Sequence, residues 1–303
     1  MLTGSNNVKI IGIGGAGCNC IKYLATQNLK NIELIMANTD KKSLNPKKEN
    51  SKISVVFLGK GLDCEEGAKG DPELGYKAGV KSYDELKMLL KGAEMVFILA
   101  GMGGGTGSGA SVVVAELARK IGAITLALVT MPFYFEGSRR EDVAKNYLEK
   151  LEQLVDGMAI MPNNSLLQTQ GCGKDFNAVL QTANYYFEDI IQTLSHLFQQ
   201  KRKFLCDFIK RNDLCFIGTG KDWGVDGLIN GVKGAINSLK MLNNIEMGEI
   251  KHILTVIAKK KLNGSEDDEV INALIEEDKI VDVVWIENKE MEDDEVKVVV
   301  LGV

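Results

Sequence analysis

Short apolar runs that alternate with segments of helical spacing set the narrowest limits on how this chain can fold. The runs lie at 8–13, 32–37, 95–100, 123–130 and 157–162. The segments with helical spacing lie at about 18–27, 112–121 and 139–154. Strands that are apolar along almost their whole length are typical of parallel sheets that helices cover on both faces. The first half of the chain therefore predicts a parallel α/β domain.

The second half of the chain opens with a long stretch that keeps helical spacing and holds neither glycine nor proline. This stretch, 176–198, predicts one helix of about six turns. Further strands are expected at 213–220, 251–260, 279–287 and 296–303, with helices near 225–242 and 267–277. The acidic runs at 265–269 and 290–295 are expected in solvated turns. We therefore expect a second, smaller α/β domain with a mixed sheet.

Composition excludes several classes of partner. The net charge of −5 leaves no basic footprint for nucleic acid, and no run of 18 apolar residues could span a membrane. The first residues lack a secretory leader pattern. The six cysteines form no C-x-x-C pair and there are only two histidines, so we expect free thiols and no metal centre. The expected location is the cytoplasm.

The first apolar run passes directly into a glycine-rich turn, GIGGAG at 12–17, which fits the pattern G-x-G-x-x-G. Asp40 follows the second strand, where a dinucleotide-binding fold places a ribose-binding acid. Alone, this pattern supports an NAD(P)-binding Rossmann unit, and a tight turn without any ligand is the alternative.

A second glycine-rich loop follows the third apolar run, with six glycines between Gly101 and Gly109. Each glycine costs conformational entropy on folding, so such a density needs a reason. Bare glycines let backbone N–H groups approach an anion, a helix N-terminus adds positive charge, and Thr106 and Ser108 add hydroxyl donors. Two such loops at one sheet edge are suited to binding a chain of phosphates. The pattern G-x-x-x-x-G-K-[ST] is absent, which excludes a P-loop NTPase.

The loop G-G-G-T-G-S-G at 103–109 resembles the signature loop of the tubulin/FtsZ superfamily. Other segments similar to that family occur in order: GIGGAGCN (12–19), ANTD (37–40), GAKGDPELG (67–75), MPFYFEGSRR (131–140) and MPNNSLL (161–167). The resemblance runs from Val8 to Val303 and is closest to bacterial FtsZ.

The resemblance implies a tubulin/FtsZ-like α/β fold in three parts. A Rossmann-like, parallel-sheet nucleotide-binding domain would occupy 1–175, the long central helix and the following loop 176–203, and a C-terminal activation-type domain 204–303. It also implies GTP or GDP as ligand, Mg²⁺ with GTP, and head-to-tail filaments in which one subunit completes the site of the next. The implied partner is a second copy of this chain or an FtsZ paralogue.

The resemblance also implies which residues bind the nucleotide. Those at the phosphates would be Gly14, Gly15, Asn19, Gly103, Gly104, Gly105, Thr106, Gly107, Ser108 and Gly109. Ala16 and Gly101 would also bind the nucleotide. Ala68 and Gly70 would lie in the loop that senses the γ-phosphate, and Glu136, Arg140 and Asn163 would contact ribose and base. Asn38, Asp40, Asn184 and Tyr185 complete the implied set.

The chain departs from the family in the segment that completes a neighbour's site. There the family reads roughly P-G-L-x-N-x-D-F-A-D, and this chain reads KRKFLCDFIK, with Leu205 for the Asn, Asp207 retained and Lys210 for the second acid. Lysine has three donors and no acceptor, so Lys210 cannot polarise the attacking water, although it could hold the γ-phosphate. Asp207 alone, or Asp213, could restore some activity. The alternative is that this loop has changed because it never contacts a neighbouring subunit. Lys201, Arg202 and Lys203 could repel a neighbour or bind its phosphates.

Two further departures concern the base and the C-terminus. Tyr185 stands where the family has its guanine-reading acid, and Leu180 where it has a stacking aromatic. Asn184 points about 100° away from Tyr185 on a helix, so base specificity stays open. Tyr185 and Tyr186 could stack on the base or pack inside the protein. The family's adaptor-binding tail is not expected after VKVVVLGV, and a shortened chain would look the same.

These observations favour a guanine-nucleotide-binding, FtsZ-like cytoskeletal protein that forms or joins filaments and hydrolyses GTP poorly. The first alternative is a cell-division GTPase that works through Asp207. The others are an NAD(P)-binding Rossmann protein and a structural paralogue that binds no nucleotide.

Overall fold

The computed structural model describes residues 7–44, 53–62, 64, 66–167, 176–211, 214–224, 226–243, 249–262 and 279–303. The chain forms two compact units, Met1–Asn184 and Tyr185–Val303, which are described in turn. Within the ranges given, no helix is both long and apolar enough to cross a membrane.

The first unit is built on a parallel sheet, as the sequence predicts. Its strands are β1 (Val8–Ile13), β2 (Ile32–Asn38), β3 (Ile53–Phe57), β4 (Met95–Gly101), β5 (Ile124–Met131) and β6 (Gly157–Pro162). They pair in the order β3-β2-β1-β4-β5-β6, and every pair is parallel. All residues of β1 are buried, as are those of β4 except its last, which accounts for their unbroken apolar sequences.

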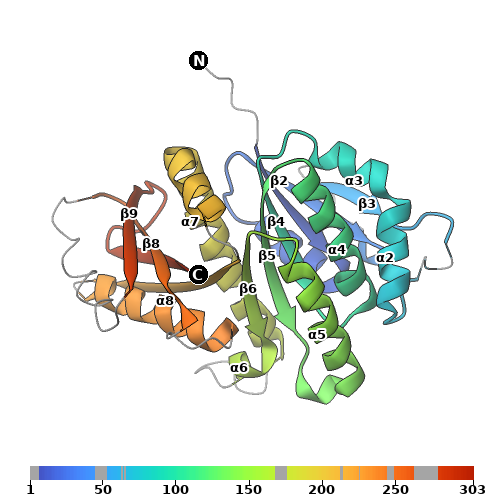
Figure 1. The fold of residues 1–303 in the computed structure, drawn as a ribbon. Helices are drawn as coiled ribbons and strands as arrows, with labels where there is room; N and C mark the ends of the chain where they lie inside the picture. Colours follow the sequence, from blue (N-terminus) through green and yellow to red (C-terminus); the bar gives the residue numbers. More distant parts are fainter. Residues whose placement is uncertain are drawn as a thin grey trace. The chain divides into compact units, whose positions relative to one another are not determined.

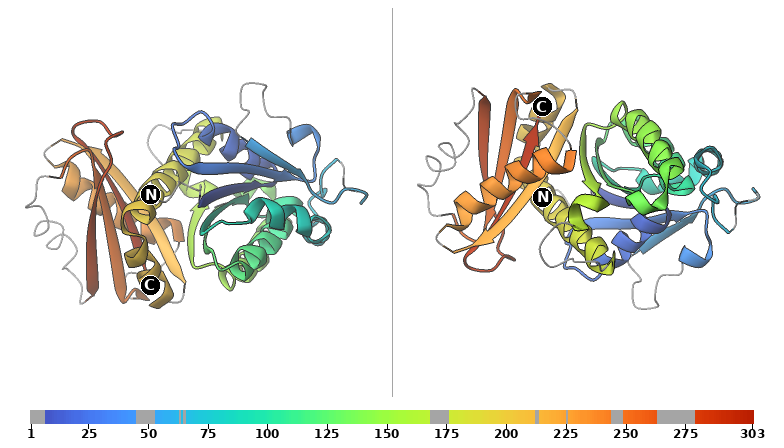
Figure 2. Two further views of the ribbon diagram at one scale, coloured as in Figure 1. Left: turned by 90° about the horizontal axis from the view of Figure 1, so that it is seen from above. Right: turned by 90° about the horizontal axis from the view of Figure 1, so that it is seen from below.

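Helices cover both faces of this sheet. They are α1 (Gly14–Leu24), α2 (Pro72–Lys81), α3 (Tyr83–Leu90), α4 (Gly105–Lys120), α5 (Ser138–Glu152) and α6 (Asn163–Leu167), with 3-10 turns at Lys42–Leu44 and Tyr134–Glu136. Helices α2 to α5 lie together over one face, and α1 lies over the other (Figures 1 and 2). Strand β3 and helices α2, α3 and α6 were not predicted from the sequence.

The strand order reverses between β1 and β4. From β1 the chain moves outward to β2 and β3, whereas from β4 it moves the other way, to β5 and β6. The register pairs Ile13 with Ala100, so the two strands end side by side. At such a switch point the loops diverge and leave a crevice outside the carboxyl ends of the strands. Both glycine-rich segments begin at this crevice.

Helix α7 (Phe176–Arg211) is broken at Lys201, where φ −134° and ψ 44° are not helical, so two helices meet there. The first of them ends close to the predicted end near residue 198, whereas the loop expected over 201–210 is wrong, because the chain beyond Lys201 is helical to Arg211. The segment beyond Lys201 has no proline or glycine to stop a helix. It also places Leu205, Phe208 and Ile209, which are all buried, on one helical face.

The second unit has the mixed sheet that the sequence predicts. Its strands β7 (Cys215–Trp223), β10 (Glu295–Gly302), β8 (His252–Lys259) and β9 (Ile280–Glu287) pair in that order. The first two pairs are antiparallel and the last is parallel. Helix α8 (Gly227–Asn243) packs on one face against a core that includes Val296, Val298 and Val300. The predicted helix at 267–277 and the acidic run at 265–269 lie outside the described residues.

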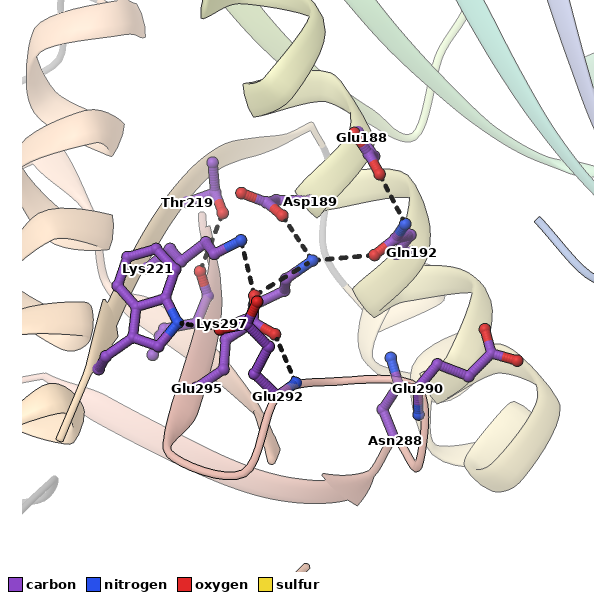
Figure 3. Close-up of polar contacts among 12 residues, drawn as sticks. Glu188, Asp189, Gln192, Thr219, Lys221, Asn288, Glu290, Glu292, Glu295 and Lys297 are labelled. Carbon is purple, nitrogen blue, oxygen red and sulfur yellow. Dashed lines mark hydrogen bonds and ion pairs between the residues drawn. The ribbon is translucent and has the colours of Figure 1, made fainter. Parts of the chain in front are cut away.

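The other face of this sheet carries a charged cluster beneath α7 (Figure 3). Residues alternate along β10, so Glu295 and Lys297 face away from α8. The Lys297 ammonium lies 2.8 Å from the Asp189 carboxylate and donates a hydrogen bond of 2.9 Å to Gln192. The Lys221 ammonium lies 2.6 Å from the Glu295 carboxylate. These partners compensate for the burial of Lys297, whose side chain is 8% exposed.

Removing the Lys297 ammonium should destabilise the protein strongly. We expect Lys297→Ala to lower the free energy of unfolding by about 3 kcal/mol, because the Asp189 carboxylate stays buried without its partner. Lys289→Ala is the matched control, since that side chain is 86% exposed. It should change stability by less than about 0.5 kcal/mol. Urea denaturation measures both, and equal losses would contradict the buried pairing.

The cluster should also make stability depend on pH through Glu295. Burial alone would raise the pKa of Glu295, but the hydrogen bond from Lys221 and the charge of Lys297 outweigh it and lower this pKa below its ordinary 4.5. A lowered pKa in the folded state stabilises the protein above that ordinary value, and the contribution is lost as the pH falls through the folded pKa. Between about pH 6 and about pH 3, the wild type should lose more unfolding free energy than Glu295→Gln. Parallel stability curves for the two proteins would refute this.

Candidate functional site

A cavity of about 610 Å³ opens at the crevice of the first unit, within the range of roughly 300–1,000 Å³ that small-molecule sites occupy. It gathers four segments that are far apart in the sequence, within 13–16, 68–70, 101–107 and 130–140, together with Asn163 and Leu180. The predicted site residues that line it are Gly14, Gly15, Ala16, Ala68, Gly70, Gly101, Gly104, Gly105, Thr106, Gly107, Glu136, Arg140 and Asn163. The two glycine-rich segments therefore form one site, as the sequence predicts from their place at one sheet edge.

Two bare helix N-termini meet this cavity. Helix α1 begins at Gly14 and α4 at Gly105, earlier than the predicted starts near 18 and 112. Neither helix has a side-chain cap, and neither has an acidic residue in its first turn. The first N–H groups of a helix have no partner within the helix, and the macrodipole adds positive charge there. The arrangement is suited to binding an anion such as phosphate.

Close backbone contacts explain why these helix starts are glycine. A Cβ added at Gly107 would lie 2.3 Å from the carbonyl oxygen of Gly101. One added at Gly14 would lie 2.9 Å from the Gly107 nitrogen. Gly109 does not line the cavity: its Cβ would lie 2.0 Å from the Pro72 carbonyl oxygen, so Gly109 serves the contact between α2 and α4.

The hydroxyl groups of the glycine loop have different surroundings. The Thr106 hydroxyl lies at the cavity, 2.6 Å from the Thr39 hydroxyl, a partner that the sequence analysis missed. Ser108 is fully buried, and its oxygen accepts a 2.9 Å hydrogen bond from the Gly103 N–H. Ser108 and Gly103 thus hold the shape of the loop and are not among the lining residues.

The lining of the cavity includes both polar and aromatic side chains. One oxygen of Glu136 accepts a 2.9 Å hydrogen bond from the Phe133 N–H, and the other pairs with Arg140. Phe133 and Phe135 stack with their ring centroids 4.9 Å apart. Asn163 is buried, and its side-chain oxygen makes no hydrogen bond within the described residues. A buried acceptor of this kind calls for a donor from a ligand or from water.

Several lining residues were absent from the predicted set: Ile13, Lys69, Met102, Thr130, Met131, Pro132, Phe133, Phe135 and Leu180. Most of them are sequence neighbours of a predicted residue. Phe133 and Phe135, for example, lie within the motif MPFYFEGSRR and could have been predicted from it. Leu180 is 41% exposed and was recognised only as the replacement of a stacking aromatic.

Three predicted polar residues near the cavity are not among those that line it. Asn19 is exposed on α1. The side-chain oxygen of Asn38 accepts from the Asp40 N–H. Asp40 lies beyond the end of β2 and accepts from the Lys42 N–H and the Ser43 hydroxyl, a hydrogen bond that lowers the pKa of Asp40. The carboxylate that would bind ribose in a dinucleotide site is thus engaged in a turn.

The remaining predicted residues lie on α7. Asn184 is half-buried and is not a lining residue, and Tyr185, the first residue of the second unit, is 53% exposed. Beyond Lys201, Leu205 is fully buried, whereas Asp207 is half-buried and Lys210 is exposed. Asp207 and Lys210 are three residues apart and therefore share a helical face. Asp213 lies outside the described residues.

The described part of the chain holds no group of three or more His, Cys, Asp or Glu side chains that could hold a metal ion. Free thiols occur at Cys18, Cys20, Cys64, Cys206 and Cys215, and Cys172 lies outside the described residues. Burial raises the pKa of Cys18 to about 12, so its thiol stays protonated at neutral pH.

Substitution by alanine should have very different effects on stability at two glycines of the cavity. Gly107→Ala should lower the free energy of unfolding by about 2 kcal/mol, because its Cβ meets backbone that cannot yield. Gly15→Ala is the control, because a Cβ there meets nothing within 4 Å. It should change stability by less than about 0.5 kcal/mol. Thermal and urea unfolding test both, and an undisturbed Gly107→Ala protein would argue against the close contact.

Comparisons with known proteins agree with this architecture. The family described as "Tubulin/FtsZ family, GTPase domain" matches residues 7–171. "Cell division protein FtsZ" of Coxiella burnetii is 32% identical over 306 residues, which span 97% of this chain and 78% of that protein. The protein of the same name from Pseudomonas aeruginosa is 31% identical over 274 residues, which span 88% and 68% of the two chains.

Solved structures show the same likeness over nearly the whole chain. "FtsZ dimer, empty" from M. jannaschii superimposes with a TM-score of 0.84 at 26% identity and covers 98% of this chain and 88% of that one. "CetZ2 from Haloferax volcanii" superimposes with a TM-score of 0.75 at 18% identity, and the match covers 98% of this chain and 92% of the CetZ2 chain. At this low identity the likeness supports the fold alone. The chain belongs to the Tubulin/FtsZ family, and both of its glycine-rich segments lie within the matched GTPase domain.

Proposed function

We propose that this protein binds GTP and GDP in the cavity at the β1–β4 switch point and forms or joins head-to-tail filaments of the cell-division type. The observation that carries the proposal is the convergence of two uncapped helix N-termini, α1 and α4, on one cavity. Family membership supplies the guanine nucleotide. The filament rests on relatives named as cell-division proteins and on a dimeric neighbour.

The phosphates would lie against the glycine-rich segments. Backbone N–H groups of Gly14 to Ala16 and of Gly104 to Gly107 would donate to their oxygens, and the Thr106 hydroxyl would add a donor. Mg²⁺ would be held chiefly by the phosphates of GTP and by water, which is how this ion usually enters nucleotide sites.

The nucleoside would lie towards the rim. The Asn163 side-chain oxygen would accept from a hydroxyl or a base N–H, which would satisfy its buried acceptor. The Phe135 ring and Leu180 offer apolar surface for the base, and Glu136 can accept from ribose hydroxyls. Preference for guanine rests on the family, because Tyr185 cannot accept two hydrogen bonds as a carboxylate does.

Hydrolysis is proposed to be weak because the segment offered to a neighbouring subunit is basic. Lys201, Arg202, Lys203 and Lys210 are all exposed around the break in α7. Lys210 replaces the acid that would accept a hydrogen bond from the attacking water, and a lysine ammonium has no acceptor. Leu205 is fully buried and offers nothing to a neighbour. The basic segment would instead hold the γ-phosphate of the neighbour's GTP.

The alternative is a GTPase that hydrolyses GTP through Asp207. It keeps one observation in its favour, because the Asp207 carboxylate is only half-buried and forms no ion pair within the ranges that the structure describes. Asp207 would have to orient the water without a second acid.

The bound nucleotide is the first thing to identify. Acid extraction of the purified protein followed by chromatography should release guanine nucleotide and no NAD(P). Adenine or nicotinamide nucleotide in its place would refute the guanine assignment and favour a different Rossmann-type function.

Replacing Lys210 should then separate the two readings of hydrolysis. Wild-type protein that pellets as polymer should release phosphate slowly from GTP, and Lys210→Asp should raise turnover by roughly tenfold or more, as a restored acceptor would. Lys233→Asp is the matched control, because it makes the same charge change at an exposed lysine of α8, outside the basic segment. Wild-type turnover that rises with protein concentration and equals that of Lys210→Asp would support the Asp207 alternative.

A further inference from the structure

A tight turn at Ala68–Asp71 carries a lysine in an unusual backbone conformation. The Asp71 N–H donates a 2.7 Å hydrogen bond to the Ala68 carbonyl oxygen. The two central residues have positive φ, +50° for Lys69 and +77° for Gly70. Positive φ at both central positions defines a type I′ turn, which favours glycine, asparagine and aspartate. A side chain longer than these in such a turn invites a functional explanation.

The turn lies against the start of α4, beside the glycine-rich segments of the cavity. A Cβ added at Gly105 would lie 2.8 Å from the Ala68 Cβ and 2.9 Å from the Asp71 nitrogen. Lys69 itself is exposed and lines the same cavity as the two bare helix N-termini. Its side chain therefore starts from the wall beside those backbone donors.

Lys69 differs from the other cation that lines the cavity. Arg140 is paired with Glu136. Among the residues that the structure describes, none forms a hydrogen bond or an ion pair with the Lys69 ammonium. This charge is therefore available to a ligand, whereas the charge of Arg140 is already engaged.

We propose that Lys69 binds the terminal phosphate of the nucleotide and makes the site prefer a nucleoside triphosphate over a diphosphate. This inference rests on the proposed function and deepens it. The backbone donors of α1 and α4 are neutral groups, whereas the lysine ammonium is a compact charge with three donors. The terminal phosphate adds negative charge within the reach of that ammonium.

Lys69 would act within a single subunit. The basic segment around Lys201 needs a neighbour, but the turn at Ala68–Asp71 belongs to the same compact unit as the cavity that Lys69 lines. The preference for triphosphate should therefore exist in the monomer, before any filament forms.

The test is the affinity of the monomeric full chain, at low protein concentration, for GDP and for a non-hydrolysable GTP analogue. We expect Lys69→Gln to reduce the preference for the triphosphate about tenfold, chiefly by weakening triphosphate binding. Lys69→Arg, which keeps the charge, should hold the preference within about twofold. Lys77→Gln is the matched control, because it removes an exposed lysine on α2 that does not line the cavity.

Lys69→Gly guards against a folding artefact, because glycine accepts the positive φ and should raise thermal stability while it removes the charge. It should lose the triphosphate preference as Lys69→Gln does. An unchanged preference in both variants, or an equal loss for both nucleotides, would overturn the assignment alone. A wild-type protein that binds neither nucleotide would overturn the proposed function as well.

Discussion

The close approach of backbone to backbone at the start of α4 is the constraint on which the rest of the first unit depends. Gly107 lies against Gly101 and the β1–α1 turn, and Gly105 and Gly109 lie against the start of α2. These contacts bring two helix N-termini to one place without side chains between them. They also fix the turn at Ala68–Asp71, so one set of glycines shapes both the cavity and its flank.

Most of the sheet could be predicted because burial on both faces leaves a plain trace in the sequence, as in β1 and β4. Helices α1 and α4 begin at Gly14 and Gly105, several residues before their predicted starts. Glycine has low helix propensity, and only tertiary packing favours it at these positions. Helix α2 did carry a local signal, Asp71 before Pro72, and the Asp71 carboxylate does accept from the Glu73 N–H. Beyond Lys201, a loop was expected from the family pattern, although the residues themselves favour a helix.

The candidate site was predictable where chemistry and motif coincide, as at Thr106, Glu136 and Asn163. It was not predictable where a polar group finds its partner nearby, because a sequence does not show that Ser108 accepts from Gly103 or that Asp40 accepts from Ser43. Lys69 was not predicted for another reason. What distinguishes it is the positive φ of its backbone, and this conformation cannot be inferred from a lysine in the sequence.

The ion pair between Glu136 and Arg140 affects how the cavity selects a ligand. Glu136 is held by the Phe133 N–H and by Arg140, so its carboxylate is ordered before anything binds. An ordered group loses little conformational entropy on binding, which is the physical content of preorganisation. A ligand that takes Arg140 away from Glu136 must exchange one charged contact for another. Selectivity at the rim is therefore set by the quality of that exchange and owes little to the ordering of loose side chains.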